Sequence, residues 1–151
     1  MDMHSWIVAF RWPLEILSLA FALAPLLIML RSWDTLPDEI PAHFGITGKP
    51  DRWGGKWQAW AVPIISIGMY AVFSTISGTW QWLLGQPTGL PNGIQPLLLL
   101  KPGIGLLMTY VTWMTVRVAR KEAEGLNPWI LYGLVALMLA PVVGLGLTAH
   151  K

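Results

Sequence analysis

The sequence predicts an all-α membrane protein: a four-helix transmembrane bundle with a structured polar loop between its first two helices. The first observation is composition, since 54% of the 151 residues are hydrophobic and only 12% are charged. Soluble domains carry about 25% charged residues, so this chain has too few charges for a soluble surface of its size. The second observation is that the apolar residues form four long runs. The third is that a polar segment rich in Pro and Gly, residues 32–56, separates the first two runs.

Each apolar run reaches or exceeds the roughly 20 residues that a helix needs to cross the hydrocarbon core of a membrane. Tryptophans support the boundaries, because Trp gathers at membrane interfaces and Trp12 and Trp33 bracket the first run. We expect the whole chain, 1–151, to form a single integral membrane domain with antiparallel neighbouring helices. The predicted spans are residues 12–31, 57–84, 97–117 and 128–147.

The positions of Lys and Arg predict the orientation in a bacterial inner membrane, since short cytoplasmic loops carry an excess of both. Most of them lie in the polar loop and in the turn between the third and fourth spans. This distribution places the polar loop in the cytoplasm and both termini outside. The loop and turn residues are Arg31, Lys49, Arg52, Lys56, Arg117, Arg120 and Lys121, and the opposite side holds Arg11, Lys101 and Lys151.

Arg31 and Arg117 are the last residues of their predicted spans, and two further charged residues fall inside the spans. Glu15 closely follows Pro13, which suits a first helical turn, and there the positive end of the helix dipole favours an anion. Lys101 lies about one turn inside the third span, from where its long side chain can extend to the interface. The alternative for both is functional: a buried carboxylate that handles an ion or a proton, and an intramembrane cation.

The polar loop is predicted to fold through turns, because Pro fixes φ and Gly permits left-handed backbone conformations. Ile40–Phe44 can be extended, with Pro41 tolerable only at the edge of a sheet. Gly45–Asp51 is then predicted as a turn and Arg52–Lys56 as a return segment. A short β-hairpin over the helix ends is the shape that these preferences favour.

Side chains on the two arms of such a hairpin can cross-link it. His43 can hydrogen-bond either Asp51 or Asp38, which favours a structural role for this histidine. Lys56 or Arg52 can in turn pair with Glu39. A contact between His43 and a ligand is the alternative role.

The loop also carries a recognisable motif. It reads Leu36-Pro37-x-x-Ile40-Pro41-x-His43-Phe44 and continues as Gly48-x-x-Asp51-x-x-x-x-Lys56. This pattern resembles the signature of the domain-of-unknown-function family numbered 1648, over roughly residues 10–85, although members usually have Asn or a similar residue where this chain has Gly45. The domain also occurs in immunity proteins for the sporulation-delaying toxin, so the resemblance implies an immunity-like or sensor-like membrane protein. The motif residues with a structural or partner-binding role would be Leu36, Pro37, Asp38, Glu39, Pro41, His43, Phe44, Gly48, Asp51 and Lys56.

Three functions are compatible with this sequence. We expect a non-enzymatic inner-membrane protein that binds a peptide or protein partner through the 36–57 loop. The first alternative is a small structural subunit of a larger membrane complex, since spans rich in Gly and Ser pack closely against other helices. The second is a metal-dependent membrane enzyme, for which the weak ligand candidates are His43, Asp38 and Asp51.

Other classes of function are disfavoured by what the sequence contains. The chain has no cysteine, which excludes disulfides, thiolate nucleophiles and Cys-ligated metals. Its net charge is only +2, and no basic face for nucleic acid is visible. We therefore expect no catalytic residues, no metal and no cofactor, with the lipid bilayer and a protein or peptide as partners and the oligomeric state left open.

Overall fold

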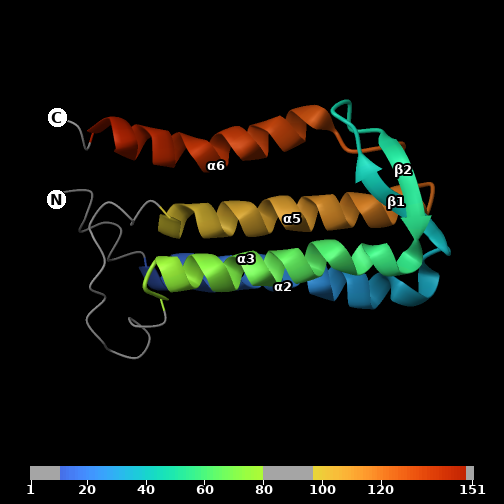
Figure 1. The fold of residues 1–151 in the computed structure, drawn as a ribbon, viewed down its shortest axis with the longest axis horizontal. Helices are drawn as coiled ribbons and strands as arrows, with labels where there is room; N and C mark the ends of the chain where they lie inside the picture. The colour runs from blue at the N-terminus through green and yellow to red at the C-terminus, as the bar shows by residue number, and fades with distance from the viewer. Residues whose placement is uncertain (1–10, 80–96, 149–151) are drawn as a thin grey trace.

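The computed structural model describes residues 11–79 and 97–148. In these residues the chain is mostly helical, and a two-stranded sheet lies across one end of the helices (Figure 1). This confirms the predicted helical architecture with a hairpin between the first two helices. The helices are α2 (Arg11–Ser32), α3 (Ala61–Ile76), α5 (Leu97–Ala119) and α6 (Pro128–Thr148).

Two helical segments in the described part of the chain are long and apolar enough to cross a membrane. They are Arg11–Thr35 and Lys56–Ile76, with mean hydropathies of 2.1 and 1.7. In α6 a shorter stretch, Pro128–Ala140, is also apolar. Figure 1 shows the four helices side by side, with the hairpin and the α5–α6 connection at the same end.

The sheet is an antiparallel hairpin of β1 (Glu39–Phe44) and β2 (Pro50–Gly55). Pro41 lies opposite Trp53 and His43 opposite Arg52, so Ala42 between them has no partner and forms a bulge. Both strands are edge strands in a sheet of two, which is where proline is tolerated. Short 3-10 helices, η1 (Trp33–Thr35) and η2 (Lys56–Trp60), join the hairpin to α2 and α3.

One buried apolar cluster fixes the hairpin to the bundle. Ile40 of β1 is only 1% exposed, and Leu36 just before the strand is 6% exposed. They pack with residues of α2, η2 and α5, so both ends of the polar loop are held against helices. The cluster consists of Met29, Leu36, Ile40, Ala59, Val116 and Ala119.

The predicted span over residues 57–84 agrees at its start with the helical segment Lys56–Ile76, but its predicted end is too late. Residues 56–60 form the 3-10 helix η2, and α3 ends at Ile76. The end is set by Gly78, which has φ +65° and donates its backbone N–H to the Thr75 carbonyl at 3.2 Å. This is the left-handed glycine cap that closes many helices. Residues 80–84 of the predicted span lie outside the described part of the chain.

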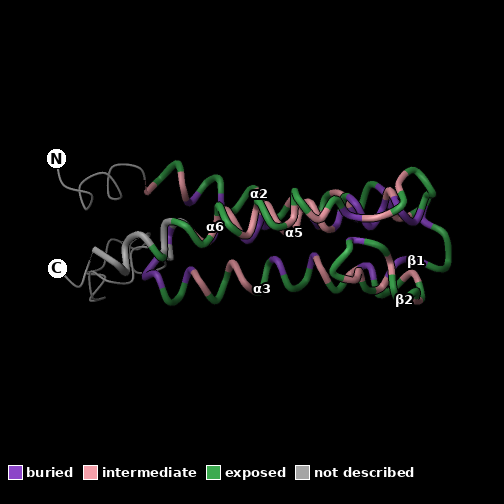
Figure 2. Tube along the Cα trace, turned by 90° about the horizontal axis from the view of Figure 1, so that it is seen from above, coloured by how far each residue is buried: buried purple, intermediate pink, exposed green. Residues whose placement is uncertain are grey.

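Helix α2 packs most extensively against α5, and small residues allow the close approach. A Cβ added at Gly105 of α5 would lie 2.8 Å from the Phe21 Cβ of α2. Ser66 of α3 donates its hydroxyl to the Ala22 carbonyl of α2 at 3.2 Å. Buried positions recur along the helices between exposed ones (Figure 2), so each helix keeps an outer face.

Candidate functional site

The predicted cross-link of the hairpin is formed by His43 and Asp51. Their Nδ1 and Oδ1 atoms are 2.7 Å apart, and the two side chains are 62% and 51% exposed. Asp38 was the other predicted partner of His43. Its backbone carbonyl accepts a hydrogen bond from the Lys56 backbone N–H at 2.8 Å. The His43–Asp51 pair thus joins β1 to the start of β2 across the turn, and both side chains are exposed to solvent.

We expect His43→Ala to lower the free energy of unfolding by less than about 1 kcal/mol, because exposed pairs contribute little. Chemical denaturation of the purified protein measures this. Asp51→Asn is the matched variant. The double variant, His43→Ala with Asp51→Asn, should be no less stable than the less stable of the two single variants. A loss well above 1 kcal/mol would show that His43 makes a further buried contact.

The predicted pairing of Lys56 or Arg52 with Glu39 is wrong, since the described part of the chain contains no such ion pair. Lys56 instead places its ammonium 4.6 Å from the ring centre of Trp33, a cation–π distance. The Trp33 ring also lies 5.0 Å from that of Trp57. Lys56 therefore holds the end of the hairpin against η1, and Glu39 is left exposed.

The tip of the hairpin docks on the connection between α5 and α6. Leu126 donates its backbone N–H to the Gly48 carbonyl at 2.8 Å. Tyr132 of α6 donates its hydroxyl to the Ile46 carbonyl at 3.0 Å. Gly48 has φ +80°, and a Cβ there would collide with the Leu126 carbonyl oxygen, so only glycine fits. The tip is therefore positioned by residues that lie far away in the sequence.

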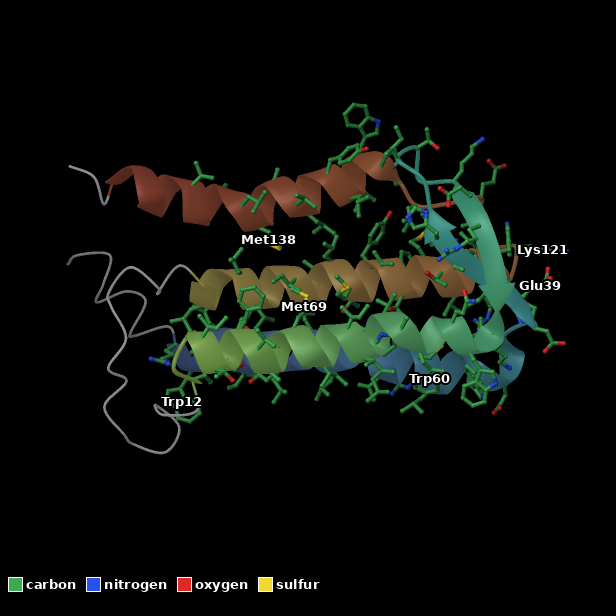
Figure 3. All side chains as sticks on the ribbon, in the orientation of Figure 1. Trp12, Glu39, Trp60, Met69, Lys121 and Met138 are labelled. Atoms are coloured by element: carbon green, nitrogen blue, oxygen red, sulfur yellow. The ribbon has the colours of Figure 1, made fainter. Side chains whose placement is uncertain are left out.

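Two open grooves flank this docked tip. One, of about 600 Å³, lies between β2 and the α5–α6 turn, with Lys49, Trp53 and Glu122 in its walls. The other, of about 540 Å³, lies between the ends of α5 and α6 and contains Trp113 and Trp129. Figure 3 shows Glu39 and Lys121 at this end of the molecule and Trp12 towards the other. The groove beside β2 is called the hairpin groove below.

The motif residues divide into buried anchors and an exposed rim. Leu36, Pro41 and Gly48 are buried, and Phe44 is half-buried. No three His, Asp or Glu side chains within residues 11–79 and 97–148 come together as a metal site, and Asp38 does not join His43 and Asp51. The exposed motif residues are Pro37, Asp38, Glu39, His43 and Asp51.

A second polar site lies inside the helices, towards the opposite end from the hairpin. Lys101 of α5 and Glu15 of α2 form an ion pair with 2.5 Å between Nζ and Oε1, and their side chains are 1% and 7% exposed. The interpretation that Lys101 extends outward to the interface is therefore wrong. Because α2 and α5 run in the same direction (Figure 1), the early positions of both helices lie at one level.

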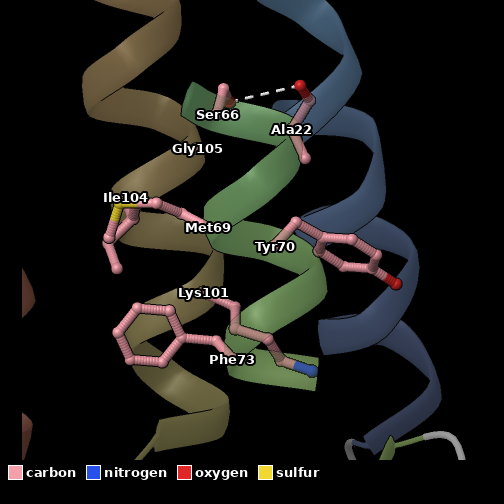
Figure 4. Close-up of a pocket in the computed structure, with 8 residues that line it drawn as sticks. All are labelled: Ala22, Ser66, Met69, Tyr70, Phe73, Lys101, Ile104 and Gly105. Atoms are coloured by element: carbon pink, nitrogen blue, oxygen red, sulfur yellow. Dashed lines mark hydrogen bonds between the residues drawn. The ribbon is translucent and has the colours of Figure 1, made fainter. Parts of the chain in front are cut away.

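Hydroxyl groups next to α3 complete this polar cluster, defined as Glu15, Ser77, Thr79 and Lys101. Thr79 donates to Glu15 Oε1 at 2.8 Å and accepts from Lys101 Nζ at 2.8 Å. Ser77 Oγ lies 2.9 Å from the Thr79 hydroxyl. Lys101 Nζ also lies 5.7 Å from the Tyr70 ring centre, and Figure 4 shows both residues beside a narrow gap between α2, α3 and α5. The sequence predicted these hydroxyl residues on a face that packs against another helix, but not their hydrogen bonds to the two buried charges.

Over residues 11–79 and 97–148, this architecture is helical, with two helical segments long and apolar enough to cross a membrane and a hairpin across one end of the helices. Residues 20–67 match the sequence model of the family described as Domain of unknown function (DUF1648), and the chain contains this domain. The match runs from the middle of α2 through the hairpin into α3. No curated protein and no solved structure matches the chain.

Proposed function

We propose that this is a non-enzymatic bacterial inner-membrane protein that binds a peptide or protein through the hairpin, in a sensor-like or immunity-like role. The observation that carries the proposal is the hairpin groove of about 600 Å³, with Trp53 half-exposed in its wall. Binding clefts commonly have volumes of about 300–1,000 Å³, and exposed Trp is frequent among residues that dominate binding energy. The groove offers both charges, from Lys49, Lys121 and Glu122, beside an apolar wall.

The rigid attachment of the hairpin supports this proposal. A surface that is already ordered loses less conformational entropy when a partner binds. Ile40 anchors one strand in the apolar cluster, and the Gly48 carbonyl bonds to Leu126 at the tip. A partner would therefore meet a preformed surface rather than a loop that must fold on binding.

We further propose that all four helices cross the membrane. Outward-facing side chains support this, since Ile16, Ile64 and Leu137 are 65%, 66% and 69% exposed on three different helices. Lipid is the environment in which such faces are stable. Helix α5 contacts α2, α3 and α6, so the charge of Lys101 faces protein rather than lipid.

In this arrangement the hairpin lies in the cytoplasm, according to the Lys and Arg distribution. The chain has no cysteine, so Thr47→Cys introduces a single thiol at an exposed site on the tip. In intact cells this thiol should resist a membrane-impermeant reagent and react after the cells are opened. Labelling in intact cells would show that the hairpin lies outside the cell, opposite to the orientation proposed here.

The binding proposal is tested by co-purification of the full chain from native membranes. Trp53→Ala and Lys121→Glu, both in the hairpin groove, should each lower recovery of a stoichiometric partner by at least tenfold while the protein remains folded. Ile67→Ala is the matched control, because Ile67 is an exposed apolar residue on α3, away from the hairpin. Retention of the partner by both groove variants would contradict binding at this site and favour the alternative role as a structural subunit held through its helices.

A further inference from the structure

The groove of about 540 Å³ between the ends of α5 and α6, called the helix-end groove below, is formed by three parts of the chain. Lys49 of the hairpin tip and Trp129 at the start of α6 line it. One face of α5 also lines it, since four of its residues there are spaced three or four positions apart. They are Tyr110, Trp113, Met114 and Arg117.

Contacts between these parts hold the groove in shape. The Tyr110 hydroxyl accepts the Asn127 backbone N–H at 2.9 Å, which fixes the start of α6 on α5. The bond from Leu126 to the Gly48 carbonyl fixes the hairpin tip beside them. The groove is therefore preformed, and its volume is within the roughly 300–1,000 Å³ of known ligand sites.

The polarity of the groove changes along α5. Arg117 lies in the last turn, near the hairpin, whereas Tyr110 lies about 10 Å deeper along the helix. Between them the Trp113 ring is 46% exposed, and the Arg117 guanidinium lies 5.0 Å from its centre. Trp129 of α6 is 81% exposed. A ligand that matches this surface is charged at the hairpin end and apolar along the helices, as a phospholipid is.

The charges around the groove indicate which headgroup fits. Lys49 and Arg117 supply cations, and Glu124 supplies a carboxylate. A second carboxylate, Glu122, lies 3.7 Å from Arg117, measured from Oε2 to Nε. An anionic headgroup would add negative charge beside both carboxylates. A zwitterionic headgroup with a primary ammonium instead offers a phosphate to the cations and N–H donors to Glu124.

We infer that the helix-end groove binds one phosphatidylethanolamine molecule from the leaflet on the hairpin side. Its phosphate binds Lys49 and Arg117, its ammonium donates to Glu124, and its acyl chains pass Trp113 towards the middle of the helices. The site depends on α5 and α6 crossing the membrane, as proposed above, because only then does the groove lie at headgroup level. It does not depend on a peptide in the hairpin groove, although Lys49 and Glu124 stand between the two grooves.

Native mass spectrometry of the full chain in detergent tests this site. An equimolar mixture of phosphatidylethanolamine, phosphatidylcholine and phosphatidylglycerol with the same acyl chains is titrated in, so the three affinities are compared directly. We expect one bound phosphatidylethanolamine, with at least fivefold higher affinity than either other lipid. Glu124→Gln should bring its affinity close to that of phosphatidylcholine, whose quaternary ammonium has no N–H to donate. Arg117→Gln should weaken all three lipids about three- to tenfold, because the phosphate is common to them.

Matched controls separate this groove from the rest of the hairpin end. Lys121→Gln removes an exposed cation that lines the hairpin groove and not this one, so lipid affinity should stay unchanged. Trp129→Ala should weaken phosphatidylethanolamine binding severalfold. Trp57→Ala should not, because Trp57 is 77% exposed at the same end but does not line the groove. The Trp129 comparison remains decisive if Arg117→Gln does not fold.

Three results would overturn the inference: equal affinity for the three lipids, a preference for phosphatidylglycerol, or unchanged binding in both Arg117→Gln and Trp129→Ala. Release of the chain from native membranes by alkaline carbonate would refute the membrane-spanning proposal, and this site with it. Retention of a protein partner by Trp53→Ala would count against the hairpin groove alone, since Trp53 does not line the helix-end groove.

Discussion

Removing one partner of the buried ion pair should destabilise the protein more than any other single change that the structure suggests. In Lys101→Met the Glu15 carboxylate stays buried and keeps the hydrogen bond from the Thr79 hydroxyl, but it loses the ammonium that neutralises it. Breaking a buried pair in this way costs roughly 3–5 kcal/mol, because a charge without a partner remains out of water. Unfolding of the purified protein by titration with a denaturing detergent measures the loss.

The double variant Glu15→Leu with Lys101→Met separates the pair from the rest of the packing. It removes both charges together, so most of the stability lost in Lys101→Met should return. Leu17→Met is the control on the same helix, because Leu17 is 45% exposed and should tolerate the change. A double variant no more stable than Lys101→Met would mean that the pair contributes through packing rather than charge.

The second large effect is expected at Gly48, at the tip of the hairpin. Gly48→Ala requires a left-handed backbone for alanine and pushes its Cβ into the Leu126 carbonyl. Strain and displaced packing together should lower the free energy of unfolding by roughly 2–4 kcal/mol. The tip should also separate from the α5–α6 connection and become sensitive to protease.

Gly55→Ala is the matched control, because Gly55 ends β2 and a Cβ there meets nothing within 4 Å. Its thermal unfolding and protease resistance should match the wild type closely. If Gly48→Ala behaves like Gly55→Ala, the docking of the tip on Leu126 does not stabilise the hairpin. Thermal scans and limited proteolysis of the two variants, run in parallel, give the answer.

Much of the fold could be predicted from the sequence because its signals are local. Long apolar runs predict helices, and the runs that begin near 97 and 128 agree closely with α5 and α6. The Pro and Gly residues of the polar loop predicted a turn between extended arms, and β1 and β2 lie there. The local signal that was overlooked is Gly78, whose left-handed cap ends α3 well before the apolar run does.

The candidate site was predicted less completely, because its contacts depend on which segments meet. The sequence offered His43 two partners, and the register of the hairpin selected Asp51. Glu15 and Lys101 stood out separately as lone charges, but their pairing spans 86 residues of sequence. Their similar depth in the first and third spans was a signal, since alternate helices of an antiparallel bundle run in the same direction.

The apolar helices and the turn-rich loop follow from local hydrophobicity and backbone preference, and the match to DUF1648 over residues 20–67 is likewise a property of the sequence alone. Two contacts could be seen only in the folded chain: the hairpin tip rests on Leu126, and Glu15 neutralises Lys101. Each of these depends on packing between segments far apart in the chain. Local preferences do not specify such packing, because it forms only when whole helices and the hairpin are in place.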